Sequence, residues 1–470
     1  MNLKECNPTG HNGYGILWIF LAVLGIDVME RKSKGKIQTK TTLSVKYAKK
    51  LLSSIFPLIL HLMQIYAIGS WYILIEQKLA KLEVMVSFVV VNLFSTALWH
   101  DVYRKKALIR DLVNKCQKIE ICFHKNVKNM NFIINICLAL TVIISTISAL
   151  LCSFYMSTYS IEYKIYYSFF WLLRNENFIC LLIRSVITVI TSIILLQLPA
   201  VVAILSSAIY YKFSNLLGSL AEDVEELRYP APEDKELLDV MKRYNLLYQL
   251  ALEVEKALSS SSFLLLCSQG LNLSVVLVVF IVLDSNSFSS VHTWECIPRL
   301  ILDPLIIVAI VLCGSRISSQ IQRIRTNLQL IHNALNYEIE NNWKTLEHVK
   351  NIMKADFPQM TALGVLTIKP VLILSTFGSV LTYGLLVLTK VNSNSTKNQR
   401  PLEIYRQATP GISYSQILTG QVTEHVAPIP NSAASPSTEN FGEIFRSHYF
   451  CTLFVPSDVN NNLKVADHFL

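Results

Sequence analysis

Polar and charged side chains inside long apolar stretches are the residues of this sequence best placed to bind a ligand. Six of them make up the predicted ligand site: Arg184, Asp303, Gln269, Asn272, Ser153 and Tyr155. A charge at the centre of a bilayer costs about 3 kcal/mol or more unless it faces a cavity or a partner. Arg184 and Asp303 lie at a similar depth in their stretches, so they suit an ion pair or the two ends of a polar pocket.

The chemistry that these groups favour is hydrogen bonding to a small polar organic molecule. Gln269 and Asn272 are three residues apart and share one helix face. An aromatic-rich segment, residues 155–171, follows Ser153, and aromatic rings beside hydrogen-bonding groups suit ligands such as sugars. For any single residue, helix packing or an interfacial aromatic belt is the alternative interpretation. It is the clustering of these groups that favours a pocket.

Catalytic signatures are absent from the sequence. It contains no P-loop, no HExxH, no GxSxG and no dinucleotide fingerprint. The ten cysteines form no CxxC pair and no Cys/His cluster at zinc spacing. We therefore predict no enzymatic activity, no cofactor and no metal site.

Composition places the chain in a membrane. Hydrophobic residues make up 52% and charged residues 16% of the 470 residues, whereas soluble domains carry about 25% charged residues. The mean hydropathy is +0.41, and the apolar residues come in long blocks. The net charge of +9 comes from basic residues between these blocks, which favours membrane orientation over nucleic-acid binding. We predict a multi-pass protein of the plasma membrane whose partners include the lipid bilayer but no nucleic acid.

Seven apolar stretches are long enough to span a bilayer, which takes about 20 helical residues. They are residues 52–75, 84–102, 131–155, 178–211, 261–284, 299–315 and 361–389. The fourth is longer than a bilayer requires, and we expect it to continue beyond the membrane with a bend at Pro199.

Basic residues are distributed unevenly between these spans. The four segments 30–50, 102–130, 212–260 and 316–359 carry 28 Lys and Arg residues, whereas 76–83, 156–177 and 285–298 carry four. Basic segments stay in the cytosol, so the N-terminus is predicted to be cytosolic and the C-terminus extracellular. This orientation is opposite to that of a G-protein-coupled receptor.

Two of the cytosolic segments are predicted to be helical. Within 212–260 and 318–353, apolar residues recur every three or four positions. Apolar helix stripes need partners. The predicted fold is therefore an all-α membrane protein with seven transmembrane helices and long cytosolic helix extensions that pack together and against other subunits.

The stretch from Phe357 to Lys390 carries the most specific sequence pattern. Its characteristic residues are Ala362-Leu363-Gly364, Ile368-Lys369, Leu374, Gly378 and Thr382-Tyr383. They resemble the last helix of the insect gustatory receptors, in which a TY pair precedes a Gln-Phe by five residues. This chain departs from that pattern in two places, with Val365-Leu366 for an aromatic pair and Thr389-Lys390 for the Gln-Phe.

The resemblance implies a ligand-gated, non-selective cation channel that opens on a small-molecule tastant. It implies a homo- or heterotetramer with other gustatory receptor subunits, in which the last helix lines a central pore. The implied pore and gate residues are Thr382, Tyr383, Leu385, Leu388, Thr389 and Lys390. A ring of lysines favours anions, so we expect this chain to conduct cations poorly as a homomer.

The two ends of the chain differ from the predicted channel domain, residues 51–390. Residues 1–50 are predicted to be a cytosolic or interfacial segment in which the apolar run 14–29 lies at the membrane surface, with a membrane span or a signal peptide as the alternatives. Residues 391–470 are rich in Asn, Ser, Pro and Thr, which predicts a disordered, low-complexity tail. A variant last exon and a native divergent tail explain it equally well.

Three other functions compete with the gustatory channel. An odorant-receptor-like channel subunit shares the same plan. A metabotropic seven-span receptor is disfavoured by the charge distribution. A transporter is disfavoured because the sequence shows no paired broken helices.

Overall fold

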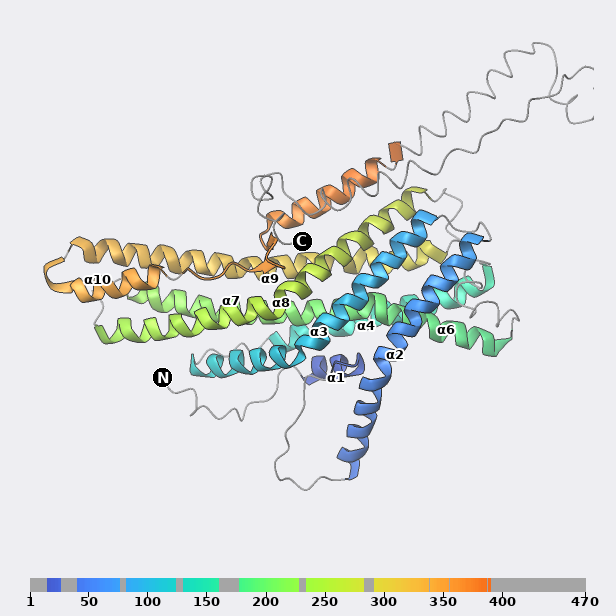
Figure 1. The fold of residues 1–470 in the computed structure, drawn as a ribbon, viewed down its shortest axis with the longest axis horizontal. Helices are drawn as coiled ribbons and strands as arrows, with labels where there is room; N and C mark the ends of the chain where they lie inside the picture. The colour runs from blue at the N-terminus through green and yellow to red at the C-terminus, as the bar shows by residue number, and fades with distance from the viewer. Residues whose placement is uncertain are drawn as a thin grey trace, which may run out of the picture. The chain divides into compact units, whose positions relative to one another are not determined.

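The protein is almost entirely helical in the computed structural model (Figure 1). The structure describes residues 15–26, 40–76, 82–123, 130–159, 177–227, 234–282, 291–337, 339–354, 356–386 and 388–389. The chain divides into two compact units, residues 1–276 with 286–374, and residues 277–285 with 375–470. The predicted all-α class is confirmed, apart from one short hairpin between the last two helices. The predicted tail, residues 391–470, lies outside the described residues.

Most helices are much longer than a bilayer is thick. In chain order they are α1 (Gly15–Val23), α2 (Lys40–Glu76), α3 (Leu82–Cys122), α4 (Met130–Tyr159), α6 (Phe178–Ser192), the π-helical turn η1 (Ile193–Gln197), α7 (Leu198–Glu226), α8 (Asp234–Val282), α9 (Val291–Tyr337) and α10 (Ile339–Lys354). With 49 residues in α8 and 47 in α9, more than half of each helix extends beyond the roughly 20 residues that cross a membrane. The predicted helix extensions are thus present.

The core of the first unit forms around α7. This helix lies beside α9 for much of its length (Figure 1), and Tyr210 and Phe213 on it are fully buried. The hydroxyl of Tyr210 is 3.0 Å from that of Ser262 on α8. Because α7 contacts α3, α4 and α9 as well, the long helices form one packed bundle rather than separate hairpins.

Among the described residues, five helices are long and apolar enough to cross a membrane. They are Ser54–Glu76, Met130–Phe154, Phe178–Glu226, Lys235–Leu277 and Cys296–Asn336. These correspond to five of the seven predicted spans. The other two predicted spans are 84–102 and 361–389, and the seven-span count and its orientation stay predictions.

The predicted second span, 84–102, lies within α3, and the side chains of residues 84, 85 and 87 lie outside the described residues. Its polar residues are matched by a polar residue of the neighbouring α2. The side chain of Gln64 donates to the carbonyl of Asn92 at 3.1 Å and to the hydroxyl of Thr96 at 2.8 Å. Interhelical hydrogen bonds of this kind are how polar groups are accommodated at membrane depth.

The predicted last span, 361–389, was wrong in its first third. Residues Thr361–Ala362 (β1) and Leu366–Thr367 (β2) form an antiparallel hairpin, and the helix begins only at Val371, with its first described stretch ending at Leu386. Its 16 residues span about 24 Å at 1.5 Å per residue. The apolar residues that suggested a longer helix, Ala362, Leu366 and Ile368, are instead buried in the first unit.

A glycine on α9 receives this hairpin segment. A Cβ atom at Gly314 would lie 2.7 Å from Cγ2 of Ile368, which is closer than two carbon atoms can approach. The absence of a side chain at Gly314 therefore lets Ile368, which is fully buried, pack against α9.

The cytosolic segment 318–353 is two helices rather than one. α9 ends at Tyr337, and α10 runs back beside it (Figure 1). Val349 and Ile352 of α10 are buried, as are Ile324 and Leu328 of α9. The apolar stripe that we expected to pack on other helices therefore finds part of its partner within the same chain.

The long fourth span changes helix type where a bend was expected. The π-helical turn η1 immediately precedes Pro199 of α7. Proline has no N–H to donate to the carbonyl four residues earlier, here that of Leu195. The π-helical turn accommodates this position, because the N–H of Leu198 bonds to the carbonyl of Ile193.

The apolar run 14–29 forms only a nine-residue helix, α1. At about 14 Å it is too short to cross a bilayer, which agrees with a segment embedded at one surface. Leu17 and Leu21 are fully buried, whereas Ile16 and Ile19 are exposed. The indole N–H of Trp99 on α3 donates to the carbonyl of Leu24 at 2.8 Å and ties the segment to the bundle.

The hairpin turn contains an unusual backbone conformation that can be tested. Leu363 and Gly364 both have positive φ, 58° and 72°, a combination that favours glycine or asparagine. Replacing Leu363, whose side chain is 52% exposed, with glycine should stabilise the protein by about 1 kcal/mol, measured as a higher Tm in detergent. Val365→Gly serves as the control, because Val365 is also exposed but has no positive φ. Equal losses of Tm in both variants would contradict this prediction.

Candidate functional site

The buried arginine Arg299 is the centre of a polar cluster on α8 and α9. Its guanidinium donates to the side-chain oxygen of Asn272 at 3.2 Å and lies 5.3 Å from the ring centre of Phe88 on α3. Asp303 follows one helical turn later on α9. Arg299, Asn272 and Asp303 are all at least 96% buried, so two helices bring one cation, one carboxyl group and one amide together.

Several polar atoms of this cluster have no hydrogen-bond partner among the described residues. They are both amide atoms of Gln269, Nδ2 of Asn272, Nε of Arg299 and Oδ2 of Asp303. A buried polar group without a partner costs about 1–3 kcal/mol. Five such atoms lie on these two helices, so a molecule that forms hydrogen bonds with them would offset this cost. The five atoms include both donors and acceptors.

A small cavity adjoins the cluster. It has a volume of about 40 Å³ and is lined by Ser148 and Cys152 of α4, Thr188 and Thr191 of α6, and Arg299 of α9. Sites for small organic molecules usually enclose about 300 Å³ or more. Such a molecule therefore enters only if α4, α6 and α9 separate.

The predicted ligand residues fall into two groups around this cavity. Asn272 and Asp303 are linked through Arg299, and Gln269 lies one turn from Asn272 on α8. On the other side, Ser153 of α4 and Ser185 of α6 are joined by their hydroxyls at 2.5 Å. Arg184 is buried next to Ser185 and one turn from Thr188 of the cavity wall. The side chain of Tyr155 lies outside the described residues.

The ion pair between Arg184 and Asp303 stays a prediction. The structure adds a second buried cation, Arg299, four residues before Asp303 on the same helix. Arg299 is the first residue of the predicted sixth span, 299–315, and was not among the predicted site residues. Its spacing of four residues from Asp303 was the available sign that both groups lie on one face of α9.

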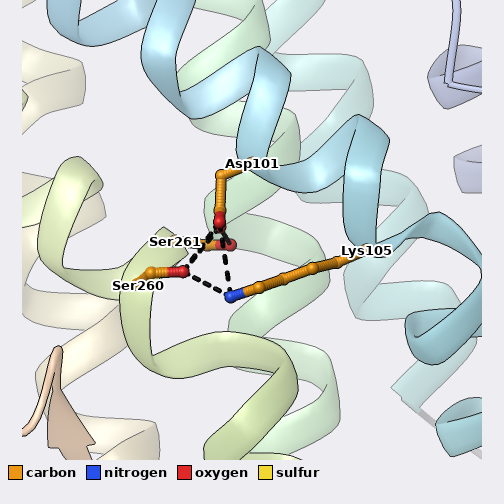
Figure 2. Close-up of polar contacts among 4 residues, drawn as sticks. All are labelled: Asp101, Lys105, Ser260 and Ser261. Carbon is orange, nitrogen blue, oxygen red and sulfur yellow. Dashed lines mark hydrogen bonds and ion pairs between the residues drawn. The ribbon is translucent and has the colours of Figure 1, made fainter.

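A second polar cluster joins α3 to α8 at the end predicted to be cytosolic (Figure 2). The carboxylate of Asp101 accepts hydrogen bonds from the hydroxyls of Ser260 at 2.8 Å and Ser261 at 2.6 Å. Lys105 lies 3.3 Å from the same carboxylate and also donates to Ser260. Asp101 therefore holds two consecutive residues of another helix.

The same part of α8 also holds the hairpin. Glu255 accepts hydrogen bonds from the backbone N–H of Thr361, at 3.0 Å, and from its hydroxyl. The N–H of Leu363 donates to the carbonyl of Ser259 at 3.1 Å. Residues 255–261 of α8 are therefore bonded to α3 through Asp101 and to the segment that leads into the last helix.

The predicted pore residues lie on the last helix and just after it. Thr382 and Leu385 are exposed in the single chain, and Tyr383 is partly buried. The hydroxyl of Thr382 donates to the carbonyl of Gly378 at 2.8 Å, and that of Thr389 to the carbonyl of Leu386 at 2.9 Å. Leu388 is exposed as well, and Lys390 lies outside the described residues.

The coupling between Arg299 and Asp303 predicts a non-additive pair of substitutions. Arg299→Met leaves the Asp303 carboxylate buried without its cation and should lower the free energy of unfolding by about 3 kcal/mol. The double variant Arg299→Met/Asp303→Leu should recover most of that loss, because both charges are gone. The measurement is chemical unfolding in detergent, analysed as a double-mutant cycle.

The matched cycle with Arg184→Met in place of Arg299→Met identifies the partner. We expect little coupling between Arg184 and Asp303, since Arg299 lies one helical turn from Asp303 on the same helix. Stronger coupling of Asp303 to Arg184 than to Arg299 would show that the arrangement described above is incorrect.

Comparison with known proteins relates the fold to one class of receptor. No protein-family model matches the sequence, and no curated protein matches it significantly. The structure, however, is similar to that of the insect olfactory receptor OR5 from Machilis hrabei in complex with eugenol, with a TM-score of 0.61 and 14% identity over 80% of this chain and 97% of that chain. A second structure of that receptor gives a TM-score of 0.59 with the same identity and coverage.

At 14% identity the similarity concerns the fold alone. It extends over 97% of the olfactory receptor chain. Both similar structures are receptors rather than enzymes. The chain has the fold of an insect olfactory receptor.

Proposed function

We propose that this chain is a subunit of a ligand-gated, non-selective cation channel of the insect chemoreceptor type, located in the plasma membrane. The observation that carries the proposal is the fold similarity over 97% of an insect olfactory receptor, one structure of which contains the small organic molecule eugenol. The five long apolar helices support a multi-pass membrane protein. A homo- or heterotetramer with other receptor subunits completes the proposed channel.

Within this class we propose a gustatory receptor, which opens on a small organic tastant such as a sugar or a bitter compound. The Thr382-Tyr383 pair of the last helix supports the gustatory assignment. The fold similarity favours the second candidate, an odorant-receptor-like subunit, equally well. The nature of the agonist, tastant or volatile odorant, separates the two.

We propose that the ligand binds at the cavity beside Arg299 and contacts Gln269, Asn272, Asp303, Arg184, Ser153 and Tyr155. The uncompensated amide atoms of Gln269 and Asn272 supply donors and acceptors for a polar ligand. Because the cavity holds only about 40 Å³, binding must favour a state in which α4, α6 and α9 are farther apart. A ligand shifts a conformational equilibrium only through such a difference in affinity between the two states.

The route from the ligand to the pore passes along α8. This helix carries Asn272 in the ligand site and, farther along, the residues 255–261 that hold the hairpin. The hairpin continues directly into the last helix, on which we propose Thr382, Tyr383, Leu385, Leu388, Thr389 and Lys390 as pore and gate. Movement of α8 therefore reaches the last helix through hydrogen bonds rather than through lipid.

Whole-cell recording tests the function. The variant Thr389→Gln/Lys390→Phe, in a chain that ends soon afterwards, should give cation currents with sugars or bitter compounds. The unmodified chain should give much smaller currents at matched surface density, because a lysine ring disfavours cations. Currents evoked only by volatile odorants would assign the odorant-receptor-like function. A ligand response that requires a G protein and no channel would overturn the channel proposal.

The proposed ligand site is tested by removing its hydrogen-bonding capacity. Gln269→Leu should raise the agonist concentration for half-maximal current by about tenfold, the effect of about 1.4 kcal/mol, while surface expression stays normal. Ser274→Ala on the same helix is the control, because the Ser274 hydroxyl already donates to the carbonyl of Gly270 at 2.9 Å. An unchanged dose response for Gln269→Leu would remove this residue from the site.

A further inference from the structure

A second, larger cavity lies at the end of the bundle predicted to be cytosolic. Its volume is about 300 Å³, which reaches the size of ordinary small-molecule sites. It is lined by residues of α8, α9 and α10 and by the segment between α10 and the last helix. None of its residues belongs to the ligand site around Arg299 or to the proposed pore.

We propose that this cavity binds a phosphate monoester. Two cations, Arg325 of α9 and Lys369, line it together with one carboxylate, Asp356, so the lining carries one net positive charge. Gln322 and Gln359 add amide groups, and Tyr244 adds an aromatic ring and a hydroxyl. Most of these groups donate hydrogen bonds, and a phosphate monoester carries negative charge and several strong acceptor oxygens.

The cations of the cavity are available to a ligand. Arg325 lies 3.6 Å from Asp356, but these side chains are 60% and 70% exposed, and ion pairs so exposed contribute little. Among the described residues no carboxylate pairs with Lys369 within 4 Å, and Gln322 and Gln359 have no hydrogen-bond partner there. An incoming phosphate therefore displaces only one weak ion pair.

The shape of the cavity is held by aromatic packing. Phe357 is buried, and its ring centre lies 4.7 Å from that of Tyr244 in an edge-to-face arrangement. The ring centre of Tyr248 lies 5.8 Å from that of Phe357. These ring contacts hold Asp356 and Gln359, one residue before and two residues after Phe357, at the cavity wall without using the charged groups.

A ligand bound in this cavity would also affect the last helix. Lys369 lies two residues before Val371, where that helix begins, while Arg325 belongs to α9. A phosphate held by both cations fixes the start of the last helix to α9. This regulatory role rests on the proposed channel function, whereas the binding itself does not.

Two sources can supply the phosphate. Ser318 of the cavity follows the predicted sixth span, 299–315, by three residues, and Lys369 precedes the last helix. The cavity thus begins at the level of lipid head groups, where a phosphorylated inositol lipid reaches it. A soluble phosphate ester reaches the same groups from the cytosol.

Binding to the purified full-length protein tests the proposal without any channel recording. The soluble probe is inositol 1,4,5-trisphosphate, and the lipid probe is a nanodisc containing phosphatidylinositol 4,5-bisphosphate, each compared with its unphosphorylated counterpart. Binding of the soluble probe assigns a free phosphate ester as a sufficient ligand. Binding in the nanodisc alone assigns the lipid head group. Binding of neither probe overturns the proposal.

Charge substitutions then locate the site. Arg325→Gln/Lys369→Gln should raise Kd by about tenfold or more, and Asp356→Asn should lower it by about threefold, because it removes the opposing carboxylate. Arg323→Gln is the matched control, since Arg323 lies on the same helix outside the cavity and pairs with Glu225 at 2.5 Å. A loss of affinity in the control as large as that in the double variant would show non-specific attraction and overturn the assignment.

Discussion

The carboxylate of Asp101 fixes the position of α8, on which both candidate regions of this protein depend. It binds the hydroxyls of Ser260 and Ser261, and Lys105 balances its charge. Within two turns of these serines, Glu255 and Ser259 hold the hairpin. Two residues of α3 and two of the hairpin are thus bonded to one two-turn segment of α8. The same helix also carries Asn272, so the ligand site and the start of the last helix are both positioned by α8.

The low polarity of the surroundings explains why some polar residues are structural and others are candidates for function. Gln64 donates to Asn92 and Thr96 of the next helix, although its Oε1 has no partner among the described residues, and Gln197 donates to the hydroxyl of Ser145 at 2.7 Å. These hydrogen bonds stabilise contacts between helices. Gln269 is equally buried, yet neither of its amide atoms has a partner among the described residues. Polar groups that remain uncompensated at membrane depth mark the place where another molecule is expected.

The sequence predicted the helical class, five of the spans and the helix extensions, because long apolar runs and helical spacing depend on local composition alone. It missed the hairpin because Ala362, Leu366 and Ile368 are buried against the bundle. Apolar residues that pack against protein and apolar residues that face lipid look the same in the sequence. It placed Asn272 and Asp303 in one site but not Arg299, which joins them. The fold-back of α10 onto α9 was also missed, because an apolar stripe shows that a helix has a partner without showing which one.

The π-helical turn η1 changes how length variation would act on this fold. A π-helical turn contains one residue more than an α-helical turn would, so it stores a single-residue insertion between α6 and α7. Deleting one residue there would let this stretch return to an ordinary α-helical turn, so α6 and α7 would keep nearly the same rotation relative to each other. The face of α6 that carries Arg184 and Thr188 would stay in place beside α4, and α7 would keep its packing on the other helices. The loss of a single codon at this point can therefore be absorbed by a change of helix type, without exchanging the residues that line the small cavity.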